Sequence, residues 1–205
     1  MKTLLRIQAS LYGAEGASSR LADAFEEQWR RENPDGRVVL RDVAAEPLPH
    51  LDLARFQSLL AHPAERTPPQ QAVSNQSDAL ITELLGADTV VIAVPMYNFG
   101  VPTQLKAWFD HIVRAGVTFR YTEAGPQGLV TGKKAYVFIA RGGHYGEMHA
   151  QTAWLRQILA FIGIEDVEFV HAEGLAIDEA TRESALAEAR RKIARLVRPA
   201  RIAAA

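Results

Sequence analysis

The residues best suited to chemistry form the run Met96-Tyr97-Asn98-Phe99-Gly100, which follows an apolar stretch at residues 90–95. Val, Ile and Ala fill most of that stretch, a composition typical of a strand that is buried on both faces of a parallel sheet. A loop that merely connects two elements needs neither two aromatic rings nor an amide. Because open parallel sheets bind ligands outside the carboxyl ends of their strands, this run predicts a platform for a flat molecule with a polar edge.

A second polar turn, residues 10–20, contains three serines and two glycines ahead of an expected helix. Free backbone N–H groups and the helix dipole favour a phosphate at such a helix N-terminus. The alternative is an ordinary N-cap, in which Ser18 or Ser19 only completes the helix. No third glycine follows Gly13 and Gly16 at the spacing of the GxGxxG fingerprint. A nucleotide-binding protein of the dinucleotide type is therefore disfavoured.

A third turn, Arg141-Gly142-Gly143, follows the apolar segment 135–140. In isolation it would be read as a plain turn. Its expected position changes this interpretation, because it lies at the carboxyl end of the strand beside the aromatic loop. Two glycines there let backbone N–H groups approach the edge of a ligand. Hydroxyl groups, aromatic rings with an amide, and paired glycines at one sheet edge together suit a phosphorylated aromatic ligand.

The remaining aromatic residues divide into two groups. Core packing on helices is the favoured interpretation for most of the group Trp108, Phe109, Trp154 and Phe161. Phe119 and Tyr121 alternate on a short extended piece outside the regular strand–helix pattern. They would either pack on the surface of their own domain or close a pocket on a partner subunit. His144 is a conceivable proton donor, although a solvated loop histidine is the favoured interpretation.

Composition argues against several classes of function. The net charge of −1 lacks the excess of Lys and Arg usual in nucleic-acid-binding proteins, so no nucleic-acid partner is expected. The chain has no cysteine, which removes thiolate nucleophiles, disulfides and iron–sulfur ligands. The six histidines form neither His-x-His nor His-Glu-x-x-His, so no metal site is expected. Redox chemistry would therefore require an organic cofactor.

The length and hydropathy of the chain predict one domain that lies free of the membrane. No stretch approaches the roughly 20 apolar residues of a membrane span, so no membrane partner is expected. The apolar run within residues 1–8 is too short for a signal peptide, and no small-residue cleavage site follows it. We expect a soluble cytoplasmic protein. Its 205 residues suit a single α/β domain, residues 1–205, and are few for two domains.

Strand and helix signals alternate along the chain and must position the three turns. Strands are expected at residues 4–9, 38–40, 90–95, 135–140 and 167–171. Helices are expected at residues 18–31, 72–85, 103–115, 150–162 and 179–197. The Pro-rich stretch 45–70 is expected to be a loop with one helical turn near residues 53–60. This alternation predicts an α/β fold of flavodoxin-like type, with a five-stranded parallel sheet in the order 2-1-3-4-5 and helices on both faces.

At these same residues the chain resembles the FMN-dependent NADH:azoreductases, a family of quinone reductases with the flavodoxin-like fold. Residues 95–99 and 103–106 are similar to the flavin loop and the following helix of that family. The similarity is nearly residue for residue over segments 114–123, 125–126 and 128–134. Residues 141–143, 161–164 and 172–174 continue the resemblance, which covers essentially the whole chain.

The resemblance implies a bound FMN, with NADH or NADPH as the electron donor. The residues implied to hold the FMN phosphate are Ser10, Gly16, Ala17 and Ser18. Those implied to line the isoalloxazine ring are Met96, Tyr97, Asn98 and Phe99, and those at its pyrimidine edge are Ala140, Arg141, Gly142 and Gly143. The family forms homodimers with active sites at the interface. The substrate pocket would therefore be drawn from Phe99, Phe119, Tyr121, His144, Tyr145 and Phe161.

The implied function is the two-electron reduction of quinones and azo compounds. Hydride would pass from NADH or NADPH to flavin N5, and the acceptor would then take the electrons at the same face, which gives ping-pong kinetics. No side chain is needed as a catalytic nucleophile, because the flavin carries the chemistry. Protons would come from water, with Tyr145 and His144 as weaker candidates. The alternative from another class is a flavin-binding electron carrier or regulatory module without NAD(P)H turnover of its own.

Overall fold

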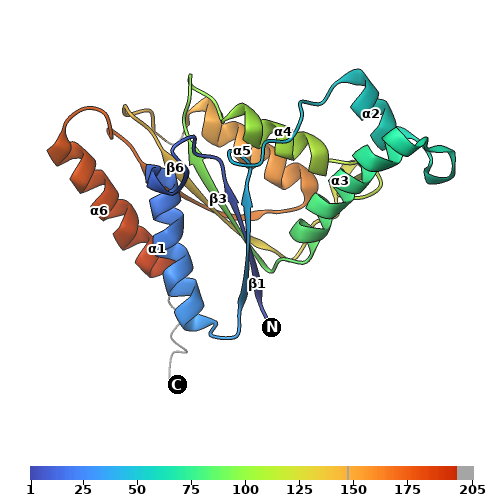
Figure 1. Ribbon diagram of the computed structural model, residues 1–205. Helices are drawn as coiled ribbons and strands as arrows, with labels where there is room; N and C mark the ends of the chain where they lie inside the picture. Colours follow the sequence, from blue (N-terminus) through green and yellow to red (C-terminus); the bar gives the residue numbers. More distant parts are fainter. Residues whose placement is uncertain (147, 198–205) are drawn as a thin grey trace.

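Five parallel strands form the central sheet of the computed structural model, which describes residues 1–146 and 148–197. They are β1 (Thr3–Gln8), β2 (Arg37–Asp42), β3 (Thr89–Pro95), β6 (Lys134–Ala140) and β7 (Asp166–Ala172). Their order across the sheet is β2-β1-β3-β6-β7 (Figure 1). The predicted five-stranded parallel sheet is confirmed. Residues 198–205, which the predicted domain includes, lie outside the described residues.

The strand order differs in its numbering from the predicted 2-1-3-4-5 because the chain has two further strands before β6. These are β4 (Phe119–Thr122) and β5 (Gly125–Gly128), which pair antiparallel in a separate two-stranded sheet. The alternating piece around Phe119 and Tyr121 is therefore one arm of a hairpin. A Cβ atom on Gly128 would lie 2.1 Å from the backbone nitrogen of Gly163, so the base of this hairpin packs directly on the end of a helix.

Helices cover both faces of the sheet (Figure 1). They are α1 (Ala17–Glu32), α2 (Leu53–Leu60), α3 (Pro68–Leu85), α4 (Thr103–Ile112), α5 (Ala150–Ile162) and α6 (Glu179–Leu196), with short 3₁₀ turns η1 (Gly13–Glu15) and η2 (Pro63–Glu65). α1 and α6 lie on one face, α3, α4 and α5 lie on the other, and α2 lies against α3. Within the described ranges, no helix is long and apolar enough to cross a membrane.

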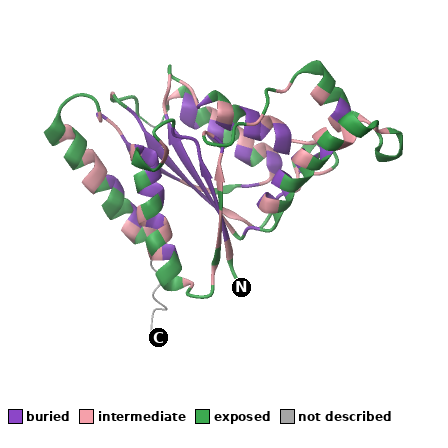
Figure 2. Cartoon of the chain, in the orientation of Figure 1, coloured by how far each residue is buried: buried purple, intermediate pink, exposed green. Residues whose placement is uncertain are grey.

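The central strand β3 is buried from both sides, as predicted for residues 90–95 (Figure 2). Val90, Ile92 and Val94 join the apolar cluster beneath α3, α4 and α5. Val91 and Ala93 point the other way, into the cluster beneath α1 and α6. Because successive strand residues face opposite sides of a sheet, a strand covered on both faces needs an apolar residue at every position.

Core packing is confirmed for the four helical aromatic residues: two are buried in the core, and two are partly buried and pack against it. Trp108 and Phe109 on α4 are almost fully buried. Trp154 is half-buried and meets the Phe109 ring edge-on, with the ring centroids 5.3 Å apart. Phe161 is also half-buried and packs against the same core cluster, and its ring contacts Phe119 at a centroid distance of 4.5 Å.

Several helix boundaries differ from those predicted. α1 begins at Ala17 with Gly16 as its N-cap, so the interpretation that Ser18 or Ser19 caps this helix is wrong. α4 ends at Ile112, three residues before the predicted end. Beyond this end the Thr118 hydroxyl donates to the carbonyl of Ile112 at 2.7 Å and accepts from the backbone N–H of Arg114 at 2.9 Å, so these groups are paired outside the helix.

The stretch 45–70 contains more regular structure than predicted. α2 makes two turns and begins with Asp52 as its N-cap, whose carboxylate accepts a hydrogen bond from the backbone N–H of Arg55 at 2.8 Å. α3 begins at Pro68, four residues before the predicted start. Proline suits the first turn of a helix because its missing N–H has no partner there in any case.

Candidate functional site

A cleft of about 430 Å³ lies at the carboxyl-terminal edge of the sheet. Its walls come from the segments that follow β1, β3, β6 and β7, as expected for an open parallel sheet. The predicted cofactor residues that line it are Ser10, Gly16, Ala17, Met96, Tyr97, Ala140, Arg141 and Gly142. Of the other four, Ser18 is buried beside the cleft wall, and Asn98, Phe99 and Gly143 belong to the loops that border it.

The first wall joins the end of β1 to the start of α1. A Cβ atom on Gly16 would lie 2.1 Å from the Ser10 hydroxyl, so only glycine allows the two segments to approach this closely. The first helical hydrogen bond runs from the N–H of Arg20 to the carbonyl of Gly16, which leaves the N–H groups of residues 17–19 without a helical acceptor. The Ser18 hydroxyl is buried and has no partner within the described chain. Such a group of free donors suits an anion, for example a phosphate.

The second wall is a two-residue turn after β3. Tyr97 and Gly100 exchange two backbone hydrogen bonds, of 3.2 and 3.0 Å. Asn98 and Phe99 between them have positive φ angles of 49° and 64°, as the central residues of a type I′ turn require. Asparagine tolerates this conformation, whereas a bulky aromatic residue is strained by it. In this conformation the Phe99 ring points outward and is 66% exposed.

The Tyr97 side chain joins this turn to the first wall. Its hydroxyl accepts a hydrogen bond from the backbone N–H of Leu11 at 3.1 Å. The turn is thus fixed against the loop that follows β1, and the aromatic and hydroxyl-bearing segments form one continuous surface.

The third wall contains Gly142 and Gly143 after β6. Their carbonyl oxygens accept hydrogen bonds from the N–H groups of Ala176 and Gly174, both at 3.0 Å. Their own N–H groups have no partner among the described residues. A Cβ atom on Gly142 would come within 3.2 Å of the Ala176 side chain, so this loop has little room for a larger residue. Two free N–H groups on a tightly packed loop can donate to the polar edge of a ligand.

Arg141 directs its side chain away from the cleft and into the protein, where the side chain is 0% exposed. Its guanidinium donates to Glu173 at 2.7 Å, to the carbonyl of Gly146 at 2.9 Å and to the hydroxyl of Thr152 at 2.6 Å. Its Nε donates to Gln151 at 3.0 Å. The guanidinium therefore supports the wall of the cleft from behind.

Glu173 completes this buried ion pair. Its carboxylate also accepts hydrogen bonds from the backbone N–H groups of Tyr145 and Gly146, each at 3.0 Å. Burial by itself would raise the pKa of Glu173, but these hydrogen bonds and the charge of Arg141 outweigh it and hold the pKa below its ordinary value. The carboxylate therefore stays ionised and keeps the loop of residues 145–146 in place.

Three predicted pocket residues lie around the turn. Phe99 meets the Tyr145 ring edge-on at a centroid distance of 6.0 Å. Phe99 also lines a separate, mostly apolar groove with Val101 and Trp154. His144 is exposed, and its ring lies so close to Gly174 that a Cβ atom there would be 2.8 Å from it. This exposed position agrees with a solvated loop histidine.

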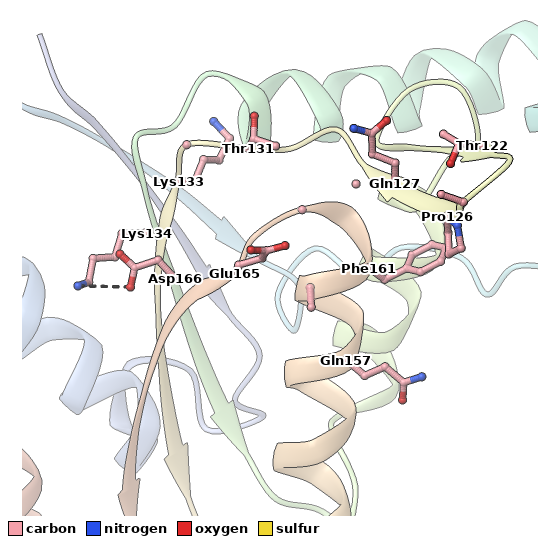
Figure 3. Close-up of a pocket in the computed structure, with 15 residues that line it drawn as sticks. Thr122, Pro126, Gln127, Thr131, Lys133, Lys134, Gln157, Phe161, Glu165 and Asp166 are labelled. Carbon is pink, nitrogen blue, oxygen red and sulfur yellow. Dashed lines mark ion pairs between the residues drawn. The ribbon is translucent and has the colours of Figure 1, made fainter.

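The other three predicted pocket residues gather at the far end of α5. Phe119 contacts both Tyr121 and Phe161, at centroid distances of 5.4 and 4.5 Å. Tyr121 is 73% exposed. Phe161 borders a hollow of about 1050 Å³ that lies beside the hairpin and the first residues of β6 and β7 (Figure 3). The lining of this hollow mixes polar and apolar groups and includes the ion pair between Lys134 and Asp166. None of the three turns borders it.

Sequence reasoning missed several residues of the cleft. Leu175 and Ala176 enter from the loop after β7, and Arg182 enters from α6. The signal was available, because the fifth predicted strand must end at the same sheet edge as the other parallel strands. No group of three or more His, Asp or Glu residues suited to a metal ion occurs in the part of the chain that the structure describes.

Comparison with known proteins shows close relatives over nearly the whole chain. The model of a flavodoxin-like fold family matches residues 1–197. The FMN-dependent NADH:quinone oxidoreductase of Cellvibrio japonicus is 49% identical over 195 residues, which cover 94% of this chain and 97% of that protein. The FMN-dependent NADH:quinone oxidoreductase of Azotobacter vinelandii is 44% identical over 198 residues, which cover 96% of this chain and all of that protein.

Solved structures give a consistent result. The crystal structure of an azoreductase from Bacillus anthracis superposes with a TM-score of 0.88 at 27% identity, covering 96% of this chain and 99% of that one. The structure of an FMN-dependent NADH-azoreductase from Bacillus anthracis in complex with FMN superposes with a TM-score of 0.85 at 25% identity, covering 97% of this chain and 100% of that one.

Proposed function

Because this chain belongs to the family of the FMN-dependent NADH:quinone oxidoreductases, we propose that it is itself an enzyme of this kind. It would bind FMN, accept electrons from NADH or NADPH, and reduce quinones or azo compounds. The observation that carries the proposal is the cleft where a helix N-terminus, an aromatic turn and two free glycine N–H groups meet. The proposal also includes a cytoplasmic location and a single FMN-binding domain over residues 1–205.

The phosphate of FMN fits the wall between β1 and α1. Ser10, the backbone of Gly16 and Ala17, and Ser18 would hold it. Three N–H groups without helical acceptors and the unpartnered Ser18 hydroxyl support this assignment, because a buried hydroxyl without a partner is costly unless a ligand satisfies it. Gly16 and Ala17 offer no polar side chain, so the backbone and the two serines would do most of the binding.

We further propose that the isoalloxazine ring lies against residues 96–99, with its pyrimidine edge at residues 140–143. The aromatic turn offers apolar contact, and the N–H groups of Gly142 and Gly143 offer donors to the ring edge. Donors that are fixed before the reaction stabilise negative charge on the ring without reorganisation. The side chain of Arg141 would contribute by holding this loop, since its guanidinium is wholly engaged inside the protein.

FMN held in this cleft would supply two-electron transfer through N5. The nicotinamide donor and the acceptor would use the same pocket in turn, which would give ping-pong kinetics. The residues of the cleft bind and orient the ring and cover one of its sides. No side chain is needed as a nucleophile. Water is the proposed source of protons, while Tyr145 and His144 lie on an exposed loop beside the turn and are secondary candidates.

We propose that the chain forms a homodimer in which the cluster of Phe119, Tyr121 and Phe161 walls the pocket of the partner. The 13-residue α5 begins at Ala150, next to the loops that border the cleft, and Phe161 lies near its other end. The two positions are roughly 17 Å apart along the helix axis. The cluster is therefore too remote to close the cleft of its own chain. Its exposed Tyr121 ring supports a role at a second subunit.

Complementation between two variants tests the shared pocket. Gly142→Val should weaken FMN binding at least tenfold in its own chain, and Tyr121→Ala should impair only the pocket of the partner. A mixed dimer then keeps one cleft intact and completed by an unmodified Tyr121. We expect mixtures of the two chains, denatured and refolded together, to show more activity than the sum of the two separate variants. A mixture with no more than the summed activity of the separate variants would contradict the shared pocket.

The enzymatic function is tested by mixing the FMN-loaded protein with NADH in an anaerobic stopped-flow instrument. We expect the visible flavin absorption to bleach rapidly with no other protein present, and to return when a quinone is added. An electron carrier or regulatory module would hold FMN without bleaching until a partner reductase is supplied. The names of the curated relatives favour the enzyme over that alternative.

A further inference from the structure

One buried side chain connects two walls of the cleft without lining the cleft itself. Gln151, in the first turn of α5, is 2% exposed. Its amide nitrogen donates to the carbonyl oxygens of Pro95 and Gly100, both at 3.1 Å. Its amide oxygen accepts the hydrogen bond from Arg141 Nε at 3.0 Å. All three partners are groups that support the aromatic turn or the glycine loop.

The chemistry of these partners fixes the orientation of the amide. Carbonyl oxygens can only accept hydrogen bonds and a guanidinium can only donate them, so the amide nitrogen must face Pro95 and Gly100 and its oxygen must face Arg141. A leucine at this position would satisfy none of the three groups. A glutamate would keep an acceptor for Arg141 but, when ionised, would offer no donor to the two carbonyls.

The residues that Gln151 holds flank the strained part of the turn. Pro95 ends β3, and Gly100 closes the turn whose central residues have positive φ angles. Strained backbone persists only where the surroundings determine it fully. Gln151 supplies that constraint at both ends of the turn and joins it to Arg141, which holds the loop after β6 through Gly146.

We propose that Gln151 is a positioning residue that keeps the Tyr97–Gly100 turn in the conformation that binds FMN. This inference rests on the proposed function, because it assigns a purpose to the turn at the same cleft. Gln151 does not touch the cofactor in this account; it raises the fraction of molecules in which the platform is already formed. The apparent affinity for a ligand falls in proportion to that fraction.

The test compares Gln151→Leu with Gln157→Leu, a matched control on the same helix whose side chain is exposed at the far hollow. FMN is titrated into each apoprotein and its fluorescence quenching is measured. We expect Gln151→Leu to raise the dissociation constant about tenfold, which is ~1.4 kcal/mol, and Gln157→Leu to change it less than about twofold. Equal dissociation constants for the two variants would overturn the proposal.

Hydrogen exchange of the apoprotein supplies a readout that needs no FMN. We expect amide exchange at residues 96–101 to accelerate at least about tenfold in Gln151→Leu, while exchange in the β4–β5 hairpin stays as in the unmodified protein, since local opening is independent of global unfolding. Equal acceleration in both segments would show general loosening and would overturn the positioning role.

Gln151→Glu separates the contact with Arg141 from the contacts with the carbonyls of Pro95 and Gly100. It also provides a second test if Gln151→Leu fails to fold. The carboxylate can still accept from Arg141, so exchange around Gly146 should remain slow while exchange at residues 96–101 accelerates. Unchanged exchange at residues 96–101 in this variant would overturn the proposal. If the unmodified protein itself does not bind FMN, the proposed function fails, whereas the exchange experiment still decides whether Gln151 holds the turn.

Discussion

Replacing Glu173 with glutamine should destabilise the protein far more than replacing an exposed glutamate with glutamine. Glu173 is the negative partner of the buried Arg141 guanidinium and also accepts two backbone hydrogen bonds from residues 145 and 146. Glutamine keeps the shape and one acceptor oxygen but removes the charge. The guanidinium would then remain buried without its counter-charge, because its other partners are neutral groups.

The size of the effect follows from the burial of this pair. Removing one partner of a buried ion pair costs about 3–5 kcal/mol, and the retained acceptor places Glu173→Gln near the lower end, about 3 kcal/mol. For a domain of this length, 1 kcal/mol shifts the melting temperature by about 2–4 °C, so we expect a fall of roughly 6–12 °C. The control is Glu27→Gln, whose partner Arg31 lies one helical turn away and is similarly exposed. That change should cost at most about 0.5 kcal/mol.

The effect should depend on pH in a defined direction. Because the pKa of Glu173 in the folded protein lies below its ordinary value, the carboxylate stabilises the fold above the ordinary glutamate range, about pH 4. This contribution is lost as the pH falls through the lowered pKa. The difference in unfolding free energy between the unmodified protein and Glu173→Gln should therefore be full at pH 7 and shrink in acid.

Thermal unfolding followed by far-ultraviolet circular dichroism, in the absence of FMN, measures all three proteins at pH 7 and at lower pH. The reasoning is refuted if Glu173→Gln melts within about 1 °C of Glu27→Gln at pH 7. It is equally refuted if the difference between Glu173→Gln and the unmodified protein grows as the pH falls.

Three further changes probe the walls of the cleft. Gly16→Ala should lower the stability by about 1–3 kcal/mol, because its Cβ would overpack against Ser10, and it should also weaken FMN binding. Gly13→Ala is the control: it has open space around it and should cost only about 1 kcal/mol, from its positive φ. Denaturant unfolding and FMN titration compare the two variants. Gly142→Val should weaken FMN binding at least tenfold with little change in circular dichroism, and normal flavin retention would count against the glycine loop. Asn98→Gly keeps the turn conformation but removes an amide donor, so the flavin midpoint potential should fall by roughly 20–30 mV; an unchanged potential would exclude Asn98 from tuning the ring.

Sequence patterns predicted the buried central strand and the sheet edge at which the three turns lie. Residues 90–95 are apolar at every position, and a strand covered on both faces requires this. The three turns could be placed at one sheet edge because parallel strands all end there. The same rule would have added Leu175 and Ala176 of the loop after β7.

Other features depend on contacts that no local pattern reveals. Arg141 lines the cleft, as predicted, but the inward direction of its side chain could not be predicted, because its partners Glu173, Thr152 and Gln151 lie on later segments of the chain. The hairpin of β4 and β5 was not predicted as such, because its residues around Gly128 are held by the end of α5 at Gly163. Tertiary contacts of this kind override the weak local preferences of short segments.

The central claim is that this cleft binds FMN through the walls formed by residues 10–18, 96–100 and 140–143. Calorimetric titration of the purified, flavin-free protein with FMN tests it most directly, with riboflavin, which lacks the phosphate, as the comparison ligand. The account predicts one FMN bound per chain and markedly weaker binding of riboflavin, since the helix N-terminus and Ser18 would have no anion to hold. No heat of binding with FMN, or equal affinity for the two ligands, would contradict it.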